Sequence, residues 1–234
     1  MGLLRSYDVL FRYALSGGNY VRCIGGGRID IHKAASLRKC KIYVYPGASL
    51  VIDEGCRLEN VTISIMRGCC HLGKNCIAEG GNIIIEDGTM VVAHHAKLAT
   101  RRIWLRFGGK LSVGEYTNIN NGSEIRCDNN IKIGSYNQIS YNVRIWDTNT
   151  HRLLPWEERR KLTREHYPYY GYEDSRPSSL PVSIGDDCWI GENCAILKGS
   201  TIGDRCVVGF GTYVIGERIG NDNTVVNERK IKLL

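Results

Sequence analysis

An aliphatic residue stands at every sixth position of the stretch Ile184-Gly-Asp-Asp-Cys-Trp-Ile190-Gly-Glu-Asn-Cys-Ala-Ile196-Leu-Lys-Gly-Ser-Thr-Ile202-Gly-Asp-Arg-Cys-Val-Val208-Gly-Phe-Gly-Thr-Tyr-Val214. A helix repeats every 3.6 residues and an alternating strand every two, so neither produces this spacing. A chain that turns a corner every six residues does, and it stacks short strands into a parallel β-helix. The stretch therefore predicts an all-β fold built from hexapeptide repeats.

The same rhythm extends toward the N-terminus with interruptions. It is firm from Val113 to Ile145, with one two-residue slip, and weaker from Gly17 to about Lys110. We expect irregular coils of the same prism in the weaker part. The expected segments are an N-terminal helical cap at 1–20, coils at 21–146, an active-site loop at 147–181, regular coils at 182–226 and a basic tail at 227–234.

Composition narrows the class of protein. The hydrophobic content of 43% and charged content of 24% are ordinary for a globular chain, and the 27 glycines suit recurring corners. The net charge of +7 suits an anionic ligand. The basic residues are scattered rather than gathered on one helix or stripe, which disfavours nucleic acid as a partner.

Two features of this chain have competing explanations. An apolar face over Leu3–Ala14 fits a short helix that caps one end of the prism, and a membrane-surface anchor is the less favoured alternative. Half of the ten cysteines occupy the small-residue position of a hexapeptide: Cys56, Cys76, Cys188, Cys194 and Cys206. There they act as small hydrophobic residues, and reduced thiols in a repeat core favour a cytoplasmic protein.

The segment from Pro181 to Asp204 resembles the hexapeptide-repeat acyltransferases, and more narrowly the maltose/galactoside O-acetyltransferase branch and its relatives in surface-polysaccharide gene clusters. This resemblance implies a left-handed β-helix, a homotrimer, and acetyl-CoA and acceptor meeting in a cleft between subunits, without a metal. It implies an O-acetyltransferase that acts on a sugar or glycan hydroxyl in a ternary complex.

The family's catalytic histidine lies on a loop that leaves the coil shortly before the Trp-Ile-Gly hexapeptide, and His151 stands at that place. A neutral imidazole there would take the proton of the attacking hydroxyl. His166, in the same loop, is the rival candidate. Asp147 either orients the imidazole or caps the turn of the loop, and the sequence leaves both roles open.

The resemblance places Asn120 and Asp128 on two acceptor-binding positions of the galactoside branch. Where that branch has an acceptor-binding serine, this chain has Arg106, which suggests an acidic acceptor as a hypothesis. The residues carried over to the acetyl-CoA site are Trp189, Glu192, Gly209, Phe210, Gly211, Arg229 and Lys232. Ile215-Gly216 replaces the family's Thr-Lys pair, which removes one expected phosphate contact.

Three alternatives remain. The first is an N-acetyltransferase of an amino-sugar nucleotide, for which the same histidine would serve. The second is a zinc-dependent carbonic-anhydrase-like β-helix, disfavoured because no two of the six histidines stand five residues apart. The third is a β-helix that has no catalytic activity.

Overall fold

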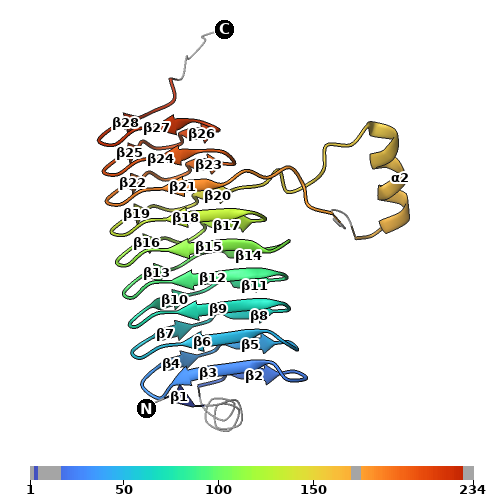
Figure 1. The fold of residues 1–234 in the computed structure, drawn as a ribbon, viewed down its shortest axis with the longest axis vertical. Helices are drawn as coiled ribbons and strands as arrows, with labels where there is room; N and C mark the ends of the chain where they lie inside the picture. Colours follow the sequence, from blue (N-terminus) through green and yellow to red (C-terminus); the bar gives the residue numbers. More distant parts are fainter. Residues whose placement is uncertain (1–2, 5–16, 170–174, 229–234) are drawn as a thin grey trace.

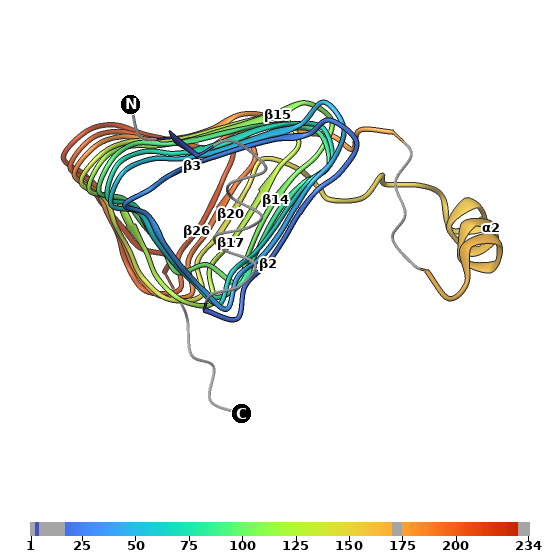
Figure 2. The ribbon, with the colours of Figure 1, turned by 90° about the horizontal axis from the view of Figure 1, so that it is seen from below.

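The chain forms a three-sided prism of stacked coils, seen in the computed structural model along its side and its axis (Figures 1 and 2). The structure describes residues 3–4, 17–169 and 175–228. Each coil contributes one strand to each of three sheets, and neighbouring strands from successive coils pair in parallel. This is the parallel β-helix predicted from the six-residue repeat, with the left hand that the family resemblance implied.

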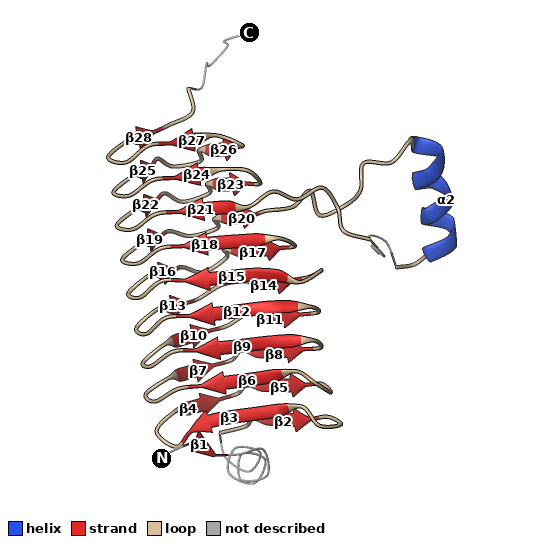
Figure 3. Cartoon of the chain, in the orientation of Figure 1, coloured by secondary structure: helices blue, strands red, loops and turns tan. Residues whose placement is uncertain are grey.

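The three faces are called sheets A, B and C, and Figure 3 shows their strands in red. Sheet A contains β1 (Leu3–Leu4), β3 (Arg28–His32), β6 (Ser49–Ile52), β9 (Gly68–Leu72), β12 (Gly88–Val92), β15 (Gly109–Val113), β18 (Asn130–Ile133), β21 (Val182–Ile184), β24 (Thr201–Ile202) and β27 (Arg218–Ile219). Sheet B contains β2 (Tyr20–Cys23), β5 (Lys41–Val44), β8 (Thr62–Ile65), β11 (Asn82–Ile85), β14 (Arg102–Leu105), β17 (Glu124–Cys127), β20 (Arg144–Trp146), β23 (Ala195–Leu197) and β26 (Tyr213–Ile215). Sheet C contains β4 (Ser36–Arg38), β7 (Arg57–Glu59), β10 (Ile77–Glu79), β13 (Lys97–Leu98), β16 (Asn118–Ile119), β19 (Gln138–Ile139), β22 (Trp189–Ile190), β25 (Val207–Val208) and β28 (Thr224–Val225).

Strand length explains why the six-residue rhythm weakens toward the N-terminus. Thr62 pairs with Asn82, 20 residues further on, whereas Ala195 pairs with Tyr213, 18 residues further on. The longer coils carry longer strands: β12 has five residues and β24 has two. The coils before the loop are 20 to 22 residues long, so the longer sides of the prism interrupt the six-residue rhythm there.

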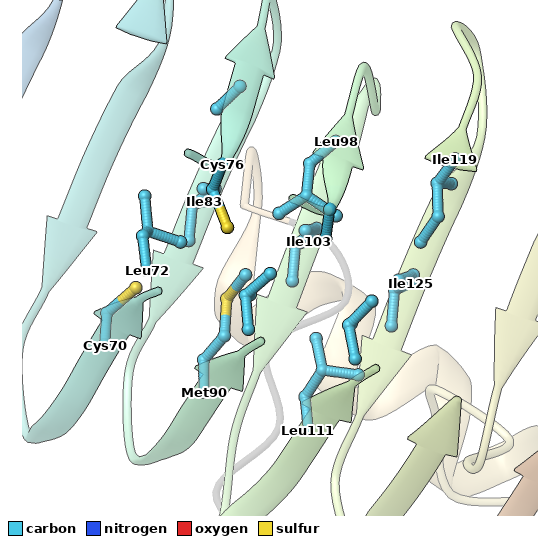
Figure 4. Close-up of a cluster of buried hydrophobic side chains, with 14 of the residues drawn as sticks. Cys70, Leu72, Cys76, Ile83, Met90, Leu98, Ile103, Leu111, Ile119 and Ile125 are labelled. Atoms are coloured by element: carbon cyan, nitrogen blue, oxygen red, sulfur yellow. The ribbon is translucent and has the colours of Figure 1, made fainter. Parts of the chain in front are cut away.

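The core is a set of aliphatic columns that run along the axis. One column on sheet B joins, in register, Ile42, Ile63, Ile83, Ile103, Ile125, Ile145, Ile196 and Val214. All eight side chains are buried, and Figure 4 shows part of this core. Full burial of one such side chain contributes about 1.5–3 kcal/mol. Cys56, Cys76, Cys188, Cys194 and Cys206 are buried free thiols in the same core, in agreement with their predicted role.

The aliphatic-Gly pairs of the repeat have a steric cause at the corner between sheets A and C. A Cβ added to Gly134 would lie 2.4 Å from the carbonyl oxygen of Gly185 in the next coil. A Cβ on Gly185 would in turn lie 2.7 Å from the carbonyl carbon of Gly203. Successive coils approach so closely here that a side chain does not fit between them.

At the N-terminal end, β1 pairs antiparallel with β3, Gly17–Gly18 form a turn, and β2 begins at Tyr20. Leu3 and Leu4 thus lie in a strand, where the sequence predicted a helix. The rest of the predicted helix, 5–16, and most of the predicted basic tail, 229–234, lie outside the described residues.

Candidate active site

The loop at 147–181 leaves the prism between β20 and β21 and closes on itself at its base. The amide N–H of Leu180 donates to the carbonyl of Asp147 at 2.9 Å, and that of Asn149 donates to the carbonyl of Ser178 at 3.0 Å. Thr148 and Ser179 form an antiparallel bridge between these bonds. The two ends of the loop therefore form a short antiparallel stem that emerges at the corner between sheets B and A.

Beyond the stem the loop contains an α-helix, α2 (Trp156–His166), which was not predicted from the sequence. Glu157 and Glu158 lie in its first turn and Arg164 and His166 in its last, which suits the helix dipole. None of its residues is buried, and Figures 1 and 3 show it held away from the coils. The sequence did contain a signal for this helix: acidic residues directly after Pro155, followed by basic residues about two turns further on.

Asp147 acts as the cap of a neighbouring corner. Its Oδ1 accepts the amide N–H of Asp128 and its Oδ2 that of Asn129, both at 2.8 Å. The side chain is fully buried, and this burial raises the pKa of the Asp147 carboxyl despite the two amide bonds. Both carboxylate oxygens thus bond the backbone of the preceding coil, and not a turn of the loop itself.

His151 is exposed and follows directly on the stem. The preceding residue, Thr150, is buried and has φ of 71°. A β-branched residue is rare in this left-handed region, and such strained backbone concentrates at functional sites. The structure thus places an accessible imidazole on a backbone segment that the prism holds firmly.

Arg106 and Asp128, both expected at the acceptor, contact each other instead. Nε of Arg106 donates to Oδ1 of Asp128 at 2.9 Å, and Nη2 donates to Oδ2 at 2.7 Å. Their side chains are 5% and 1% exposed. The charge of Arg106 is thereby matched inside the protein, and its contact with an acidic acceptor stays a prediction.

Asn120 lies on a different corner of the prism. It precedes β17, whereas Asp128 follows it, so about 13 Å of strand separates the two positions at about 3.3 Å per residue. Asn120 is half-buried, and its Oδ1 accepts Nδ2 of Asn118 at 3.3 Å. Within one chain, Asn120 is therefore not brought to the His151 loop.

Four of the expected coenzyme residues line one groove of about 280 Å³ at the corner between sheets C and B. Its lining residues are Ser140, Trp189, Gly191, Glu192, Val207, Val208, Gly209 and Phe210. Trp189 and Phe210 are 57% and 67% exposed, and the amide of Gly211 donates to the carbonyl of Glu192 at 2.8 Å. Arg229 and Lys232 lie outside the described residues.

Three side chains that join the loop to the preceding coil were not predicted from the sequence. Arg126 donates from Nη1 to Oγ1 of Thr150, and Thr148 donates from Oγ1 to Oδ2 of Asp128 at 2.6 Å. Arg176, from the returning end of the loop, donates from Nε to the carbonyl of Asp128 at 2.8 Å. No periodic pattern marks these positions, because they act through contacts between coils.

Comparisons with known proteins agree with this architecture. Residues 181–216 match the family described as bacterial transferase hexapeptide, six repeats. The polySia-specific acetyltransferase NeuO is similar over 90% of this chain and 83% of its own, with a TM-score of 0.58 and 16% identity. The polysialic acid O-acetyltransferase OatWY is similar over 89% and 84%, with a TM-score of 0.49 and 17% identity. Residues 181–216 therefore carry the hexapeptide repeat that the resemblance indicated, and the fold of the chain is that of the hexapeptide-repeat acyltransferases it resembles.

The described residues form neither a metal centre nor a membrane span. No group of three or more histidine, cysteine, aspartate or glutamate side chains in residues 3–4, 17–169 and 175–228 is arranged to hold a metal ion. In the same part of the chain, no helix has the length and apolar character needed to cross a bilayer.

Proposed function

We propose that this hexapeptide-repeat protein is an acyltransferase that transfers acetyl from acetyl-CoA to a hydroxyl of a sugar or surface polysaccharide, with His151 as the general base. The observation that carries the proposal is the strained, firmly held backbone that presents His151 at the mouth of the loop stem. The groove at Trp189 and Phe210 supports it, because exposed aromatic rings above a glycine-lined floor suit a nucleotide-bearing cosubstrate.

Acetyl transfer to a hydroxyl requires a general base and hydrogen-bond donors to the developing oxyanion. Acetyl-CoA supplies the acyl group as a thioester. Nε2 or Nδ1 of His151 accepts the hydroxyl proton as the hydroxyl oxygen attacks the thioester carbonyl. The same imidazole returns the proton to the sulfur of the departing thiolate, so that ester and free thiol are formed with no net change in the enzyme. Backbone N–H groups are the expected oxyanion donors.

The proposed site spans two subunits. The groove follows strands β22 and β25 of sheet C, whereas the loop of His151 follows β20 of sheet B. Within one chain, the groove lies where the strands of sheet B begin, and the loop of His151 lies where they end. A cleft between neighbouring subunits of a homotrimer would bring the groove of one to the His151 of the other.

The test is transfer of labelled acetyl from acetyl-CoA to a panel of neutral glycans, acidic glycans and amino sugars. We expect a sugar hydroxyl to be the preferred acceptor, and His151→Ala to lower kcat/KM by about 10²–10⁴-fold, the usual contribution of a general base. His166→Ala, in the same loop, is the matched control and should retain activity. Trp189→Ala should raise the KM for acetyl-CoA.

Three results would contradict the proposal. Full activity of His151→Ala, with loss in His166→Ala, would move the base to His166. Preference for an amine would favour N-acetyl transfer. No binding of acetyl-CoA to the wild type, by calorimetry, would favour a protein that has no catalytic activity.

A further inference from the structure

Thr150 is held by hydrogen bonds on each of its polar groups. Its carbonyl accepts Nη2 of Arg106 at 3.1 Å, and its amide N–H donates to Oγ1 of Thr148 at 3.1 Å. Its own Oγ1 accepts Nη1 of Arg126, also at 3.1 Å. A β-branched residue keeps a φ of 71° only where its surroundings impose it, and these three bonds impose it here.

Arg106 is fixed in turn. The bidentate pair with Asp128 uses two of its nitrogens, and its guanidinium lies 4.4 Å from the centre of the Trp104 ring. Oδ2 of Asp128 also accepts Oγ1 of Thr148, the residue that holds the Thr150 amide. The contacts therefore form a closed circuit, Arg106–Asp128–Thr148–Thr150, which leads back to Arg106.

The circuit is confined to the coils beside the loop. At the same corner position, the two preceding coils carry Met66, which is 42% exposed, and Glu86, which is half-buried. The buried ion pair of Arg106 and Asp128 lies at the corner between sheets B and A. It joins the two described coils that precede the coil from which the loop of His151 leaves. A pair that served only to join coils would have no reason to be restricted to this place.

We propose that Arg106 and Asp128 are positioning residues that fix the direction in which Thr150 presents His151. The inference rests on the proposed role of His151 and gives the two charged residues a task other than contact with the acceptor. Lysine cannot replace Arg106, because an ammonium group cannot bond both carboxylate oxygens and the Thr150 carbonyl in one plane.

The kinetic test compares Arg106→Lys with Arg205→Lys. Arg205 forms an exposed bidentate pair with Asp222 at 2.6 and 2.8 Å on another corner, so it is a matched control. We expect Arg106→Lys to lower kcat by about 100-fold, the loss that small misplacement of a reacting group causes, with both KM values unchanged. A raised KM for the acceptor with kcat preserved would instead assign Arg106 to acceptor binding and overturn the inference.

A second test does not need activity. Trypsin cleavage after Arg152, followed by mass spectrometry and normalised to cleavage after Arg160 in α2, reports the order of the segment beside His151. Cleavage after Arg152 should be several-fold faster in Arg106→Lys and in Thr148→Val, which keeps the ion pair but breaks the circuit. Arg205→Lys should match the wild type.

The two tests separate the two proposals. Equal cleavage in Arg106→Lys, Thr148→Val and the wild type would overturn the positioning role even if His151 is the base. Faster cleavage in Arg106→Lys and Thr148→Val would show that the circuit orders the segment beside His151. Unchanged activity of His151→Ala in the same study would overturn the proposed function.

Discussion

Single polar side chains decide the shape of the corner from which the loop leaves. Asp147 occupies a fully buried position, yet both of its carboxylate oxygens accept backbone N–H groups of the coil before it. Glu124 lies nearby between Arg126 and Arg102. Burial alone would raise the pKa of Glu124, but the hydrogen bonds from both arginines outweigh it and lower the pKa. Backbone amides thus bond the carboxylate of Asp147, whereas two arginines bond that of Glu124.

Asp147→Ala tests this corner. The substitution leaves the amide groups of Asp128 and Asn129 buried without an acceptor, at about 1–3 kcal/mol each. We expect the free energy of unfolding, measured in urea, to fall by about 2–4 kcal/mol. Asp186→Ala is the control, because Oδ1 of Asp186 accepts an exposed amide, that of Ser135, at 2.7 Å. Equal effects of the two substitutions would show that burial of the cap is unimportant.

At this scale the sequence could predict only what a local motif or a family resemblance marks. The resemblance, and not the repeat alone, assigned the base to His151, on the loop that leaves the coil before the Trp-Ile-Gly hexapeptide. The contact between Arg106 and Asp128 was not predicted, because the two residues come from different coils. A single sequence does not tell which side chains become neighbours across a coil of 20 to 22 residues.

Strand length decides how much of each element the sequence could predict. The six-residue repeat is detectable where strands have two or three residues, and it is obscured where β9, β12 and β15 have five. Buried residues still alternate along β12 and β15 and at the end of β9, so a repeat of about twenty residues would have identified the core positions. Helix α2 escaped detection because its stabilising features are charges at its ends and not a buried face.

Gly134→Ala tests the close approach of coils. The added methyl group would meet the carbonyl of Gly185, so neighbouring strands must separate, and we expect a loss of about 2–3 kcal/mol in the free energy of unfolding. Gly220 occupies the equivalent place in the last coil, where the nearest atom is 3.6 Å from the added Cβ. Gly220→Ala should change stability by less than about 1 kcal/mol; a loss comparable to that of Gly134→Ala would contradict the steric explanation.

At the scale of the whole molecule, the prism is one continuous stack that a long loop does not interrupt. Arg144 pairs with Ala195 in the same register as neighbouring coils, although the loop lies between them. Contacts in such a stack join each coil to the next, so stability is a sum of neighbouring interfaces. The loop leaves the stack at one corner, and its helix α2 buries no side chain against the coils.

Excision of 155–169 with a short Gly-Ser replacement tests this independence. None of the α2 side chains is buried, and the stem and Arg176 are kept. We expect the thermal midpoint to stay within about 3 °C of the wild-type value, since no core contact is lost. Far-ultraviolet circular dichroism should retain its β signal. A midpoint lowered by more than about 10 °C would mean that the helix supports the fold.

The preserved register across the loop has an evolutionary consequence. An insertion that does not shift the pairing of β20 with β23 can lengthen, shorten or change its chemistry without any compensating substitution in the coils. Selection on the loop and selection on the structural integrity of the coils can then act in separate parts of the gene. The hexapeptide stack would be inherited almost unchanged, while the segment between Thr148 and Ser179 diversifies at its own rate.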